Sequence, residues 1–295
     1  MWSTTGRSIG ARTFVAIVAL CLAACTPAQP VGSTEPSATT TFVPSAPPSV
    51  APSAPPVSAA PSESPRNPAP YVEGAPFDPA IDPANFVEGV DHPFFPMEVG
   101  ATFIFDGDEH VEVEVLADTK VIMGITATVV RDRVFDGCAL VEDTLDWYGQ
   151  DAQGNVWYLG EETAEYEDGE ITSTAGSWEA GVDGALPGIV MLADPQAGDI
   201  YRQEFYEGEA EDIGEVIAVS GTVSVPAGEW SGSDVLVTEE WTPLEPGVRE
   251  RKIYARGFGV VRIKAIQGGD ELTVLTSAEL PDRSAGEPGV ACARA

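Results

Sequence analysis

The chain has 295 residues, of which 47 are acidic and 15 are basic, giving a formal net charge of −32. Nucleic-acid binding needs a basic patch, and docking on anionic lipid headgroups needs clustered cations, so this charge excludes nucleic acid as a partner and headgroup docking by the protein surface. It favours cations or basic molecules as partners.

The N-terminus predicts export and lipid attachment. Arg7 and Arg12 precede an uncharged apolar run at residues 13–24, which is the pattern of a secretory signal peptide and is too short to span a bilayer stably. The run ends in Leu22-Ala23-Ala24-Cys25, which looks like the lipobox of bacterial lipoprotein precursors. We therefore expect residues 1–24 to be removed and Cys25 to carry the lipid (diacylglyceryl and an acyl chain such as palmitate). The protein would then be anchored to the cell membrane and face the extracytoplasmic side.

Residues 25–90 are expected to form the lipidated cysteine and a disordered linker. The stretch 26–90 holds 16 of the 25 prolines and few large apolar side chains, so it buries too little surface to offset chain entropy. An extended Pro-rich segment of this kind acts as a spacer between membrane and domain. We place an acidic β-rich domain at residues 91–280 and a C-terminal tail at 281–295.

Alternating apolar and polar residues predict β-strands throughout the domain. The clearest alternation lies at residues 111–115, 140–148 and 261–265. Turn signals separate such runs at 106–107, 151–155, 168–169, 226–228, 246–247 and 268–270. The spacing predicts an all-β fold, an antiparallel meander of roughly ten to twelve strands forming a curved sheet, half-barrel, barrel or sandwich.

The apolar segment at residues 180–198 interrupts this meander. Leu186, Ile189, Val190, Met191 and Leu192 lie too close together for a solvated loop. We expect this segment to cover an open end or face of the sheet, as a lid would.

Cys138 and Cys292 are the two cysteines that follow Cys25. Outside the cytoplasm thiols tend to be oxidised, and a single pair has one intramolecular connectivity. We expect a disulfide between them, with two unpaired thiols as the alternative.

Several sequence stretches resemble a group of uncharacterised bacterial lipoproteins with a β-rich domain. The resemblance covers roughly residues 92–278 and is carried by Asp146–Asp151, Gly154–Glu161, Gly176–Ile189, Tyr201–Tyr206, Pro243–Pro246 and Tyr254–Val261. Its most distinctive pattern is DWYxQDxxGNVWYxGE followed by GSWEAGVDGAxPGI. The resemblance implies the extracytoplasmic location and the β-rich fold, and it assigns no catalytic or binding residue.

Aromatic side chains are the candidates for a ligand groove. Trp147, Trp157 and Trp178, with Glu179 and Arg202 nearby, could line one, and Trp147 and Trp157 could pair across a hairpin. A hydrophobic core is the alternative explanation for the same tryptophans.

Enzymatic and metal motifs are sparse. His92 and His110 are the only histidines, and no nucleophile elbow, phosphate loop or zinc-protease pattern occurs, so no catalytic residue and no metal ligand is assigned. Two acidic clusters, at residues 161–170 and 204–215, contain enough oxygen ligands for calcium, but solvated strand faces explain them better.

The sequence thus favours a membrane-anchored envelope lipoprotein whose noncatalytic β-domain binds an unidentified envelope ligand or protein. One alternative is a carboxylate-dependent envelope hydrolase, because such residues need no particular sequence spacing. Another is a structural or calcium-stabilised surface module, with calcium as its cofactor.

Overall fold

The computed structural model describes residues 66–287 and residue 292, which belong to one compact unit. The predicted signal peptide at 1–24, the predicted lipid site Cys25 and the linker up to residue 65 lie outside the described residues.

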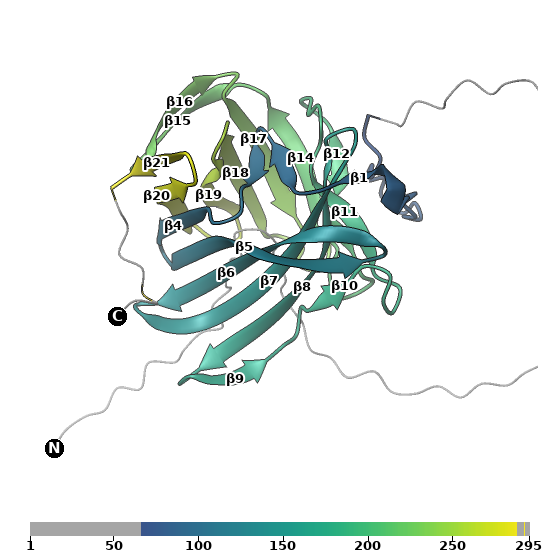
Figure 1. The fold of residues 1–295 in the computed structure, drawn as a ribbon, viewed down its shortest axis with the longest axis horizontal. Coiled ribbons are helices and arrows are strands. Elements are labelled where there is room, and N and C mark those ends of the chain that lie inside the picture. The colour runs from purple at the N-terminus through teal and green to yellow at the C-terminus, as the bar shows by residue number, and fades with distance from the viewer. Residues whose placement is uncertain (1–65, 288–291, 293–295) are drawn as a thin grey trace, which may run out of the picture. The chain divides into compact units, whose positions relative to one another are not determined.

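Antiparallel strands make up most of this unit, as Figure 1 shows. The first half contains the short 3-10 helix η1 (Pro83–Asn85) and the strands β1 (Phe86–Val87), β2 (Val90–His92), β3 (Phe95–Met97), β4 (Thr102–Gly107), β5 (His110–Ile122), β6 (Ile125–Asp136), β7 (Ala139–Asp151), β8 (Val156–Glu167), β9 (Glu170–Ser173) and β10 (Trp178–Glu179). The second half contains β11 (Leu186–Met191), β12 (Ile200–Arg202), β13 (Glu204–Phe205), β14 (Ile213–Ala218), β15 (Gly221–Val225), β16 (Gly228–Gly232), β17 (Val235–Trp241), β18 (Arg249–Ala255), β19 (Gly259–Gln267), β20 (Leu272–Leu280) and β21 (Arg283–Gly286).

The long strands follow one another as a meander. Strands β4 to β8 pair with their sequence neighbours, and so do β17 to β20. Within residues 66–287, 17 of the 21 strands belong to one large sheet, while β2–β3 and β15–β16 form separate two-stranded sheets. The strand number exceeds the expected ten to twelve because many of these strands are only two to five residues long.

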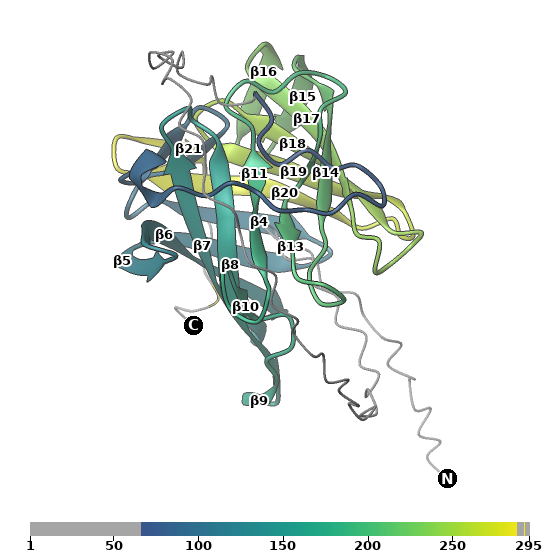
Figure 2. The same cartoon turned by 90° about the vertical axis from the view of Figure 1, so that its right-hand side faces the viewer.

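The large sheet is nearly closed into a barrel (Figure 2). On one side β20 pairs with β4, with Leu275 opposite Phe105 and Ala278 opposite Phe103. On the other side β11 pairs with both β8 and β13. Strand β14 pairs with both β12 and β17. These pairings confirm the prediction of an all-β, antiparallel, strongly curved meander.

The predicted turns lie where strands reverse. The best example is the β8–β9 hairpin, where Asp168 and Gly169 adopt positive φ angles of 53° and 81°. Asp and Gly tolerate this left-handed conformation better than other residues, which is why the dipeptide marks a tight reversal.

The apolar segment expected to act as a lid is instead a strand of the sheet. Residues 186–191 form β11, which pairs with β8 and with β13. An apolar run without alternation is also typical of a strand that is buried on both faces, and the side chains from Pro187 to Met191 are all buried. The expectation of a lid at 180–198 is therefore wrong.

The folded unit also begins earlier and ends later than the composition suggests. Pro70 forms a β-bridge with Tyr201, and the Phe86–Val87 strand pairs with β7. At the other end β21 pairs with β20, so residues 283–286 belong to the sheet. Proline-rich composition obscured the first boundary, because scattered apolar residues such as Phe77 and Phe86 still pack against the core.

We predict that Gly188→Ala destabilises the domain. A Cβ atom at Gly188 would lie 2.3 Å from the backbone carbonyl carbon of Gln203, in the contact between β11 and the β12–β13 segment. Such overpacking costs about 1–3 kcal/mol, measured as the free energy of unfolding in urea. The matched control is Gly221→Ala, whose Cβ would meet only the side chain of Val235, at 3.2 Å. Equal losses for the two variants would contradict the tight backbone approach.

Candidate functional site

The outer face of the sheet carries a groove of about 620 Å³. This volume falls in the range of small-molecule and short-peptide sites, about 300–1,000 Å³. The groove is lined by residues of β5 to β9 and of the chain that follows β9: Leu116, Arg131, Asp143, Leu145, Glu162, Thr163, Ala164, Tyr166, Ile171, Thr174 and Ser177.

Strand alternation places an apolar floor in this groove. Leu145 on β7 lies directly opposite Glu162 on β8, and Tyr166 lies opposite Ile171 across the β8–β9 hairpin. Opposite residues of an antiparallel pair share a face of the sheet. Ile171 is 58% exposed, so the floor presents a large apolar side chain to solvent at the edge of the groove.

One ion pair crosses the groove. The Nε atom of Arg131 donates to Oδ1 of Asp143 at 2.7 Å, and a second guanidinium nitrogen faces Oδ2. This hydrogen bond with Asp143 raises the pKa of Arg131, so the guanidinium stays charged. The negative charge of Asp143 balances that positive charge within the ion pair. The exposed carboxylate of Glu162 remains beside the pair, so the polar part of the groove is net acidic.

The segment between β9 and β10, which forms one wall of the groove, is attached to β8 by Ser177. The Oγ atom of Ser177 accepts a hydrogen bond from the backbone N–H of Thr163 at 3.0 Å and donates to the carbonyl oxygen of the same residue at 3.2 Å. These contacts hold the chain between β9 and β10 against the edge of β8, where β9 and β10 both pair.

The inner face of the same strands is unexpectedly acidic. Of the alternating residues on β7, Thr144 and Asp146 are buried, whereas Leu145 is partly exposed on the outer face. Asp132 on β6 and Glu161 on β8 occupy the same inner face, because Asp132 is opposite Thr144 and Asp146 is opposite Glu161. Opposite them β18 contributes Glu250 and Lys252, and further buried acids come from Glu204, Asp212 and Glu240.

Only part of this interior charge is compensated. Lys252, the one lysine or arginine among the buried residues of the described structure, has its Nζ atom 2.7 Å from Oε2 of Glu240. Burial disfavours its charge, but Glu240 and Glu250 outweigh that effect and raise the pKa of Lys252. Both carboxylate oxygens of Asp132 are buried and have no hydrogen-bond partner in the described structure.

Burial raises the pKa of several of these carboxyl groups. Desolvation, reinforced by neighbouring acids, raises the pKa of Asp132 and of Glu204 well above the usual range. Desolvation also raises the pKa of Asp146 and of Glu250 to about 7 in each case. The hydroxyl of Tyr158 donates to Oδ1 of Asp146 at 2.6 Å, which opposes the shift without cancelling it.

The interior acids do not form an accessible catalytic pair. The seven buried carboxyl side chains Asp132, Asp146, Glu161, Glu204, Asp212, Glu240 and Glu250 are each at most 6% exposed. A glycosidase-like pair must contact its substrate directly. The hydrolase alternative therefore gains no support from this interior.

The predicted tryptophans do not line one groove. Trp147 lies on the outer face, where Nζ of Lys120 is 3.1 Å from its ring centroid. Trp157 is buried beside Phe86 and donates its indole N–H to Asp151 at 2.9 Å. Trp178 faces inward and packs edge-on against Tyr158, with ring centroids 5.3 Å apart.

Strand register explains this separation. Tyr148 is opposite Tyr158, with their rings stacked at 5.0 Å, and Trp157 is opposite Gly149. The expected pairing of Trp147 with Trp157 is therefore wrong, because the hairpin register places Trp157 two residues away from the position opposite Trp147.

The two predicted polar partners also separate. Glu179 forms an ion pair with Lys120 at 2.8 Å and so lies near Trp147. Arg202 on β12 lies over the ring of Phe205, 4.5 Å from its centroid, and faces Glu211 at 4.0 Å. The five residues of the predicted groove thus divide among the outer face, the interior and β12.

The two acidic clusters are divided by the same alternation. In the first, Glu161 is buried inside whereas Glu162 and Glu167 are exposed. In the second, Glu204 and Asp212 are buried whereas Glu207 and Glu209 are exposed. Neither cluster collects its carboxylates on one side of the sheet, and calcium stays the less favoured alternative.

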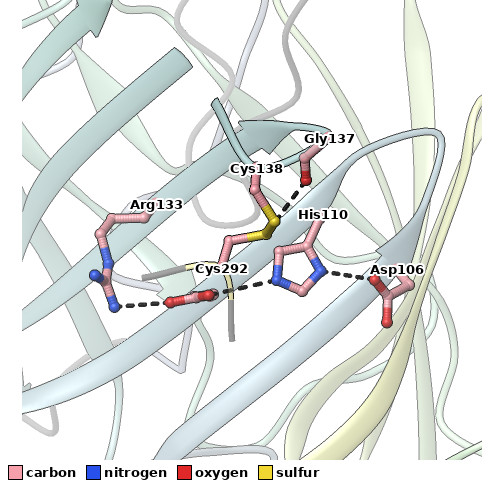
Figure 3. Close-up of a disulfide and its surroundings, with 7 residues drawn as sticks. Asp106, His110, Arg133, Gly137, Cys138 and Cys292 are labelled. Atoms are coloured by element: carbon pink, nitrogen blue, oxygen red, sulfur yellow. Dashed lines mark hydrogen bonds and ion pairs between the residues drawn. A yellow bond between two sulfur atoms is a disulfide. The ribbon is translucent and has the colours of Figure 1, made fainter. Parts of the chain in front are cut away.

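The structure joins Cys138 and Cys292 by a disulfide, with Cα atoms 5.1 Å apart. It links the turn between β6 and β7 to residue 292, and His110 lies beside it (Figure 3). None of the helices in the described part of the chain is both long and apolar enough to cross a bilayer.

No protein-family model and no curated protein matches the chain. Among solved structures, a candidate exported protein with a YmcC-like fold from Bacteroides fragilis NCTC 9343 is 14% identical, with 62% of this chain and 96% of that chain covered and a TM-score of 0.38. A candidate lipoprotein from Parabacteroides distasonis ATCC 8503 is 10% identical, with 63% and 98% covered and a TM-score of 0.35. Both TM-scores are too low to carry an argument about fold or function.

We predict that the domain loses stability as the pH rises from about 4.5 to 7. In this window the folded chain keeps protons on Asp146 and Glu250, and on Asp132 and Glu204, that the unfolded chain releases, so the free energy of unfolding falls with rising pH. Buried His92, whose pKa desolvation lowers to about 4, acts in the opposite direction but is outnumbered by these four carboxyls. For Glu250 the difference between 4.5 and about 7 corresponds to roughly 3 kcal/mol. Urea unfolding at pH 5 and pH 8 measures the change.

The Asp146→Asn variant tests the origin of this pH dependence. Asparagine keeps an oxygen for the Tyr158 hydroxyl but does not titrate, so the fall in stability should be smaller than in the parent chain. Asp118→Asn, at an exposed position of β5, is the control for the change in net charge. An unchanged fall in Asp146→Asn, or stability that rises with pH in the parent chain, would show that the buried carboxyls are not protonated.

Proposed function

We propose that this protein is a lipid-anchored extracytoplasmic lipoprotein whose β-domain binds a cationic amphipathic peptide segment without catalysing a reaction. The observation that carries this proposal is the groove of about 620 Å³ on the outer face, with an apolar floor and an acidic polar side. A ligand of this class fits because its apolar side chains cover the floor while its cations approach the acids.

Charge complementarity supports the choice of a cationic ligand. The groove contains Asp143, Glu162 and one arginine whose charge is already paired. The whole chain carries a net charge of −32, so its long-range field attracts basic ligands and repels acidic ones. Apolar contact with Leu145, Tyr166 and Ile171 then supplies the part of the affinity that salt does not screen.

The same negative charge supports a lipid anchor as the means of membrane attachment. An acidic surface is repelled by anionic headgroups, so membrane attachment requires another device. A lipid on Cys25 supplies it, and the Pro-rich stretch that begins at residue 26 separates the binding domain from the bilayer.

We predict that Asp143→Asn weakens the binding of a fluorescently labelled peptide of alternating lysine and leucine residues. The substitution leaves the Arg131 charge unpaired, so the groove repels the cationic probe. We expect a loss of roughly fivefold, which corresponds to about 1 kcal/mol, in a fluorescence anisotropy titration at low salt. Ile171→Ser should weaken binding as well, but by an amount that does not depend on salt.

Two matched variants control this experiment. Asp118→Asn removes one exposed carboxylate outside the groove, and Val121→Ser removes one exposed apolar side chain from β5. Both should bind the peptide as the parent chain does. The proposal fails if the parent chain does not bind the probe, or if each control variant loses as much affinity as its groove counterpart.

We further predict that Cys25→Ala releases the protein from the membrane fraction of the producing cells. The substitution removes the thiol that takes the diacylglyceryl group, so the variant lacks the predicted anchor. Fractionation followed by immunoblotting measures the distribution. Retention of the variant in membranes after a high-salt wash would contradict lipid anchoring and leave the groove prediction intact.

A further inference from the structure

Two side chains with metal-binding atoms, His110 and Glu112, lie beside the two sulfur atoms of the disulfide. The donor atoms of His110, Glu112 and Cys292 all lie within 4.8 Å of one another, and Cys138 is bonded to Cys292. Figure 3 shows the imidazole of His110 beside the disulfide. These residues come from the start of β5, the β6–β7 turn and residue 292, so only the folded chain brings them together.

The imidazole of His110 is oriented as a metal ligand would be. Its Nδ1 atom is 2.7 Å from Oδ1 of Asp106, so the neutral tautomer that carries its proton on Nδ1 donates to this carboxylate and offers the Nε2 lone pair to a metal. Nε2 is buried, lies 3.4 Å from Oε1 of Glu112, and has no hydrogen-bond partner in the described structure. When a histidine binds a metal through one ring nitrogen, the other ring nitrogen usually donates to a carboxylate or carbonyl, as Nδ1 of His110 does to Asp106.

The carboxylate of Glu112 is also held in place. Its Oε2 atom accepts a hydrogen bond from Arg133 at 2.9 Å, while Oε1 faces His110. Glu112 is buried although it belongs to the outer side of β5, because it packs beneath this cluster. Both side chains are thus already oriented, one by Asp106 and one by Arg133.

We propose that reduction of the Cys138–Cys292 disulfide creates a zinc site formed by both thiolates, Nε2 of His110 and Oε1 of Glu112. The required reductant is a thiol: two molecules are oxidised to a disulfide, while the Cys138–Cys292 bond breaks and takes up two electrons and two protons. Zinc binding then releases those two protons, because the ligands are thiolates.

The donor set selects the metal. Two sulfurs, one imidazole nitrogen and one carboxylate oxygen suit the four-coordinate preference of Zn²⁺, whereas Ca²⁺ and Mg²⁺ require oxygen ligands. The disulfide and the metal are mutually exclusive, because a disulfide offers no thiolate. Each of them connects residue 292 to the β6–β7 turn, so this end of the chain stays attached in both redox states. This inference is independent of the peptide groove.

The test is a cobalt titration of the full chain after reduction with a phosphine and anaerobic removal of the reductant. Cobalt replaces zinc in such sites and reports thiolate ligation by a charge-transfer band. We expect one Co²⁺ per reduced chain, with that band, and displacement by Zn²⁺. The oxidised chain should show no such band.

Variants separate a specific site from loose binding to thiols. His110→Ala should weaken Co²⁺ binding at least tenfold, and the positioning variant Asp106→Asn should weaken it by about 10–100-fold. Glu114→Gln, two residues further along β5, is the matched control and should bind as the parent chain does. Circular dichroism of each reduced variant reports whether it remains folded.

Three results would overturn the proposal. The first is a reduced parent chain that binds no Co²⁺, folded or not. The second is binding without the thiolate band, and the third is a Cys138→Ser/Cys292→Ser double variant that binds Co²⁺ as tightly as the reduced parent chain.

Discussion

The antiparallel pairing of β20 with β4 is the contact on which the rest of this structure depends. It joins residues 273–279 to residues 102–107 and so brings the two ends of the domain together in one sheet. Without this pairing the meander would be an open sheet with two solvated edges. With it, each strand of the large sheet has an inner and an outer face, and alternate residues are assigned to one or the other.

This assignment places acidic side chains in the interior, where an ordinary β-sandwich has apolar ones. On β6 and β7 the inner positions carry Asp132, Thr144 and Asp146, and the opposite wall carries Lys252. An interior with more acids than bases is tolerated because burial raises the pKa of its carboxyl groups, and a protonated carboxyl carries no charge. The outer positions of the same strands, including Leu145, are then available for a ligand.

The sequence was informative about local structure. Alternation at 111–115, 140–148 and 261–265 lies within β5, β7 and β19, and the turn signals lie at strand reversals. It did not reveal which face of β7 points inward, because apolar Leu145 and Trp147 suggest the face opposite to the one that the closed sheet encloses. Alternation of apolar and polar residues identifies a strand, but the curvature of the whole sheet determines which face of that strand points inward.

The groove itself was beyond sequence reasoning for a related reason. Its residues come from five strands, and their proximity depends on registers such as Leu145 opposite Glu162, which a bulge after Asp146 shifts. Tryptophan content drew attention to Trp147 and Trp157, yet these side chains are covered by Lys120 and Phe86. No sequence signal marked the groove, because apolar alternation assigns Leu145 and Trp147 to the core face of β7.

The central claim is that this nearly closed sheet binds its ligand on the outer face and not in its acidic interior. Methyl NMR of the isoleucine and leucine side chains, recorded with and without the lysine–leucine peptide, tests it most directly. The account predicts shifts for the groove residues Leu116, Leu145 and Ile171, with Leu236, Leu275 and Ile263 in the core unchanged. Shifts confined to the core methyl groups would contradict it.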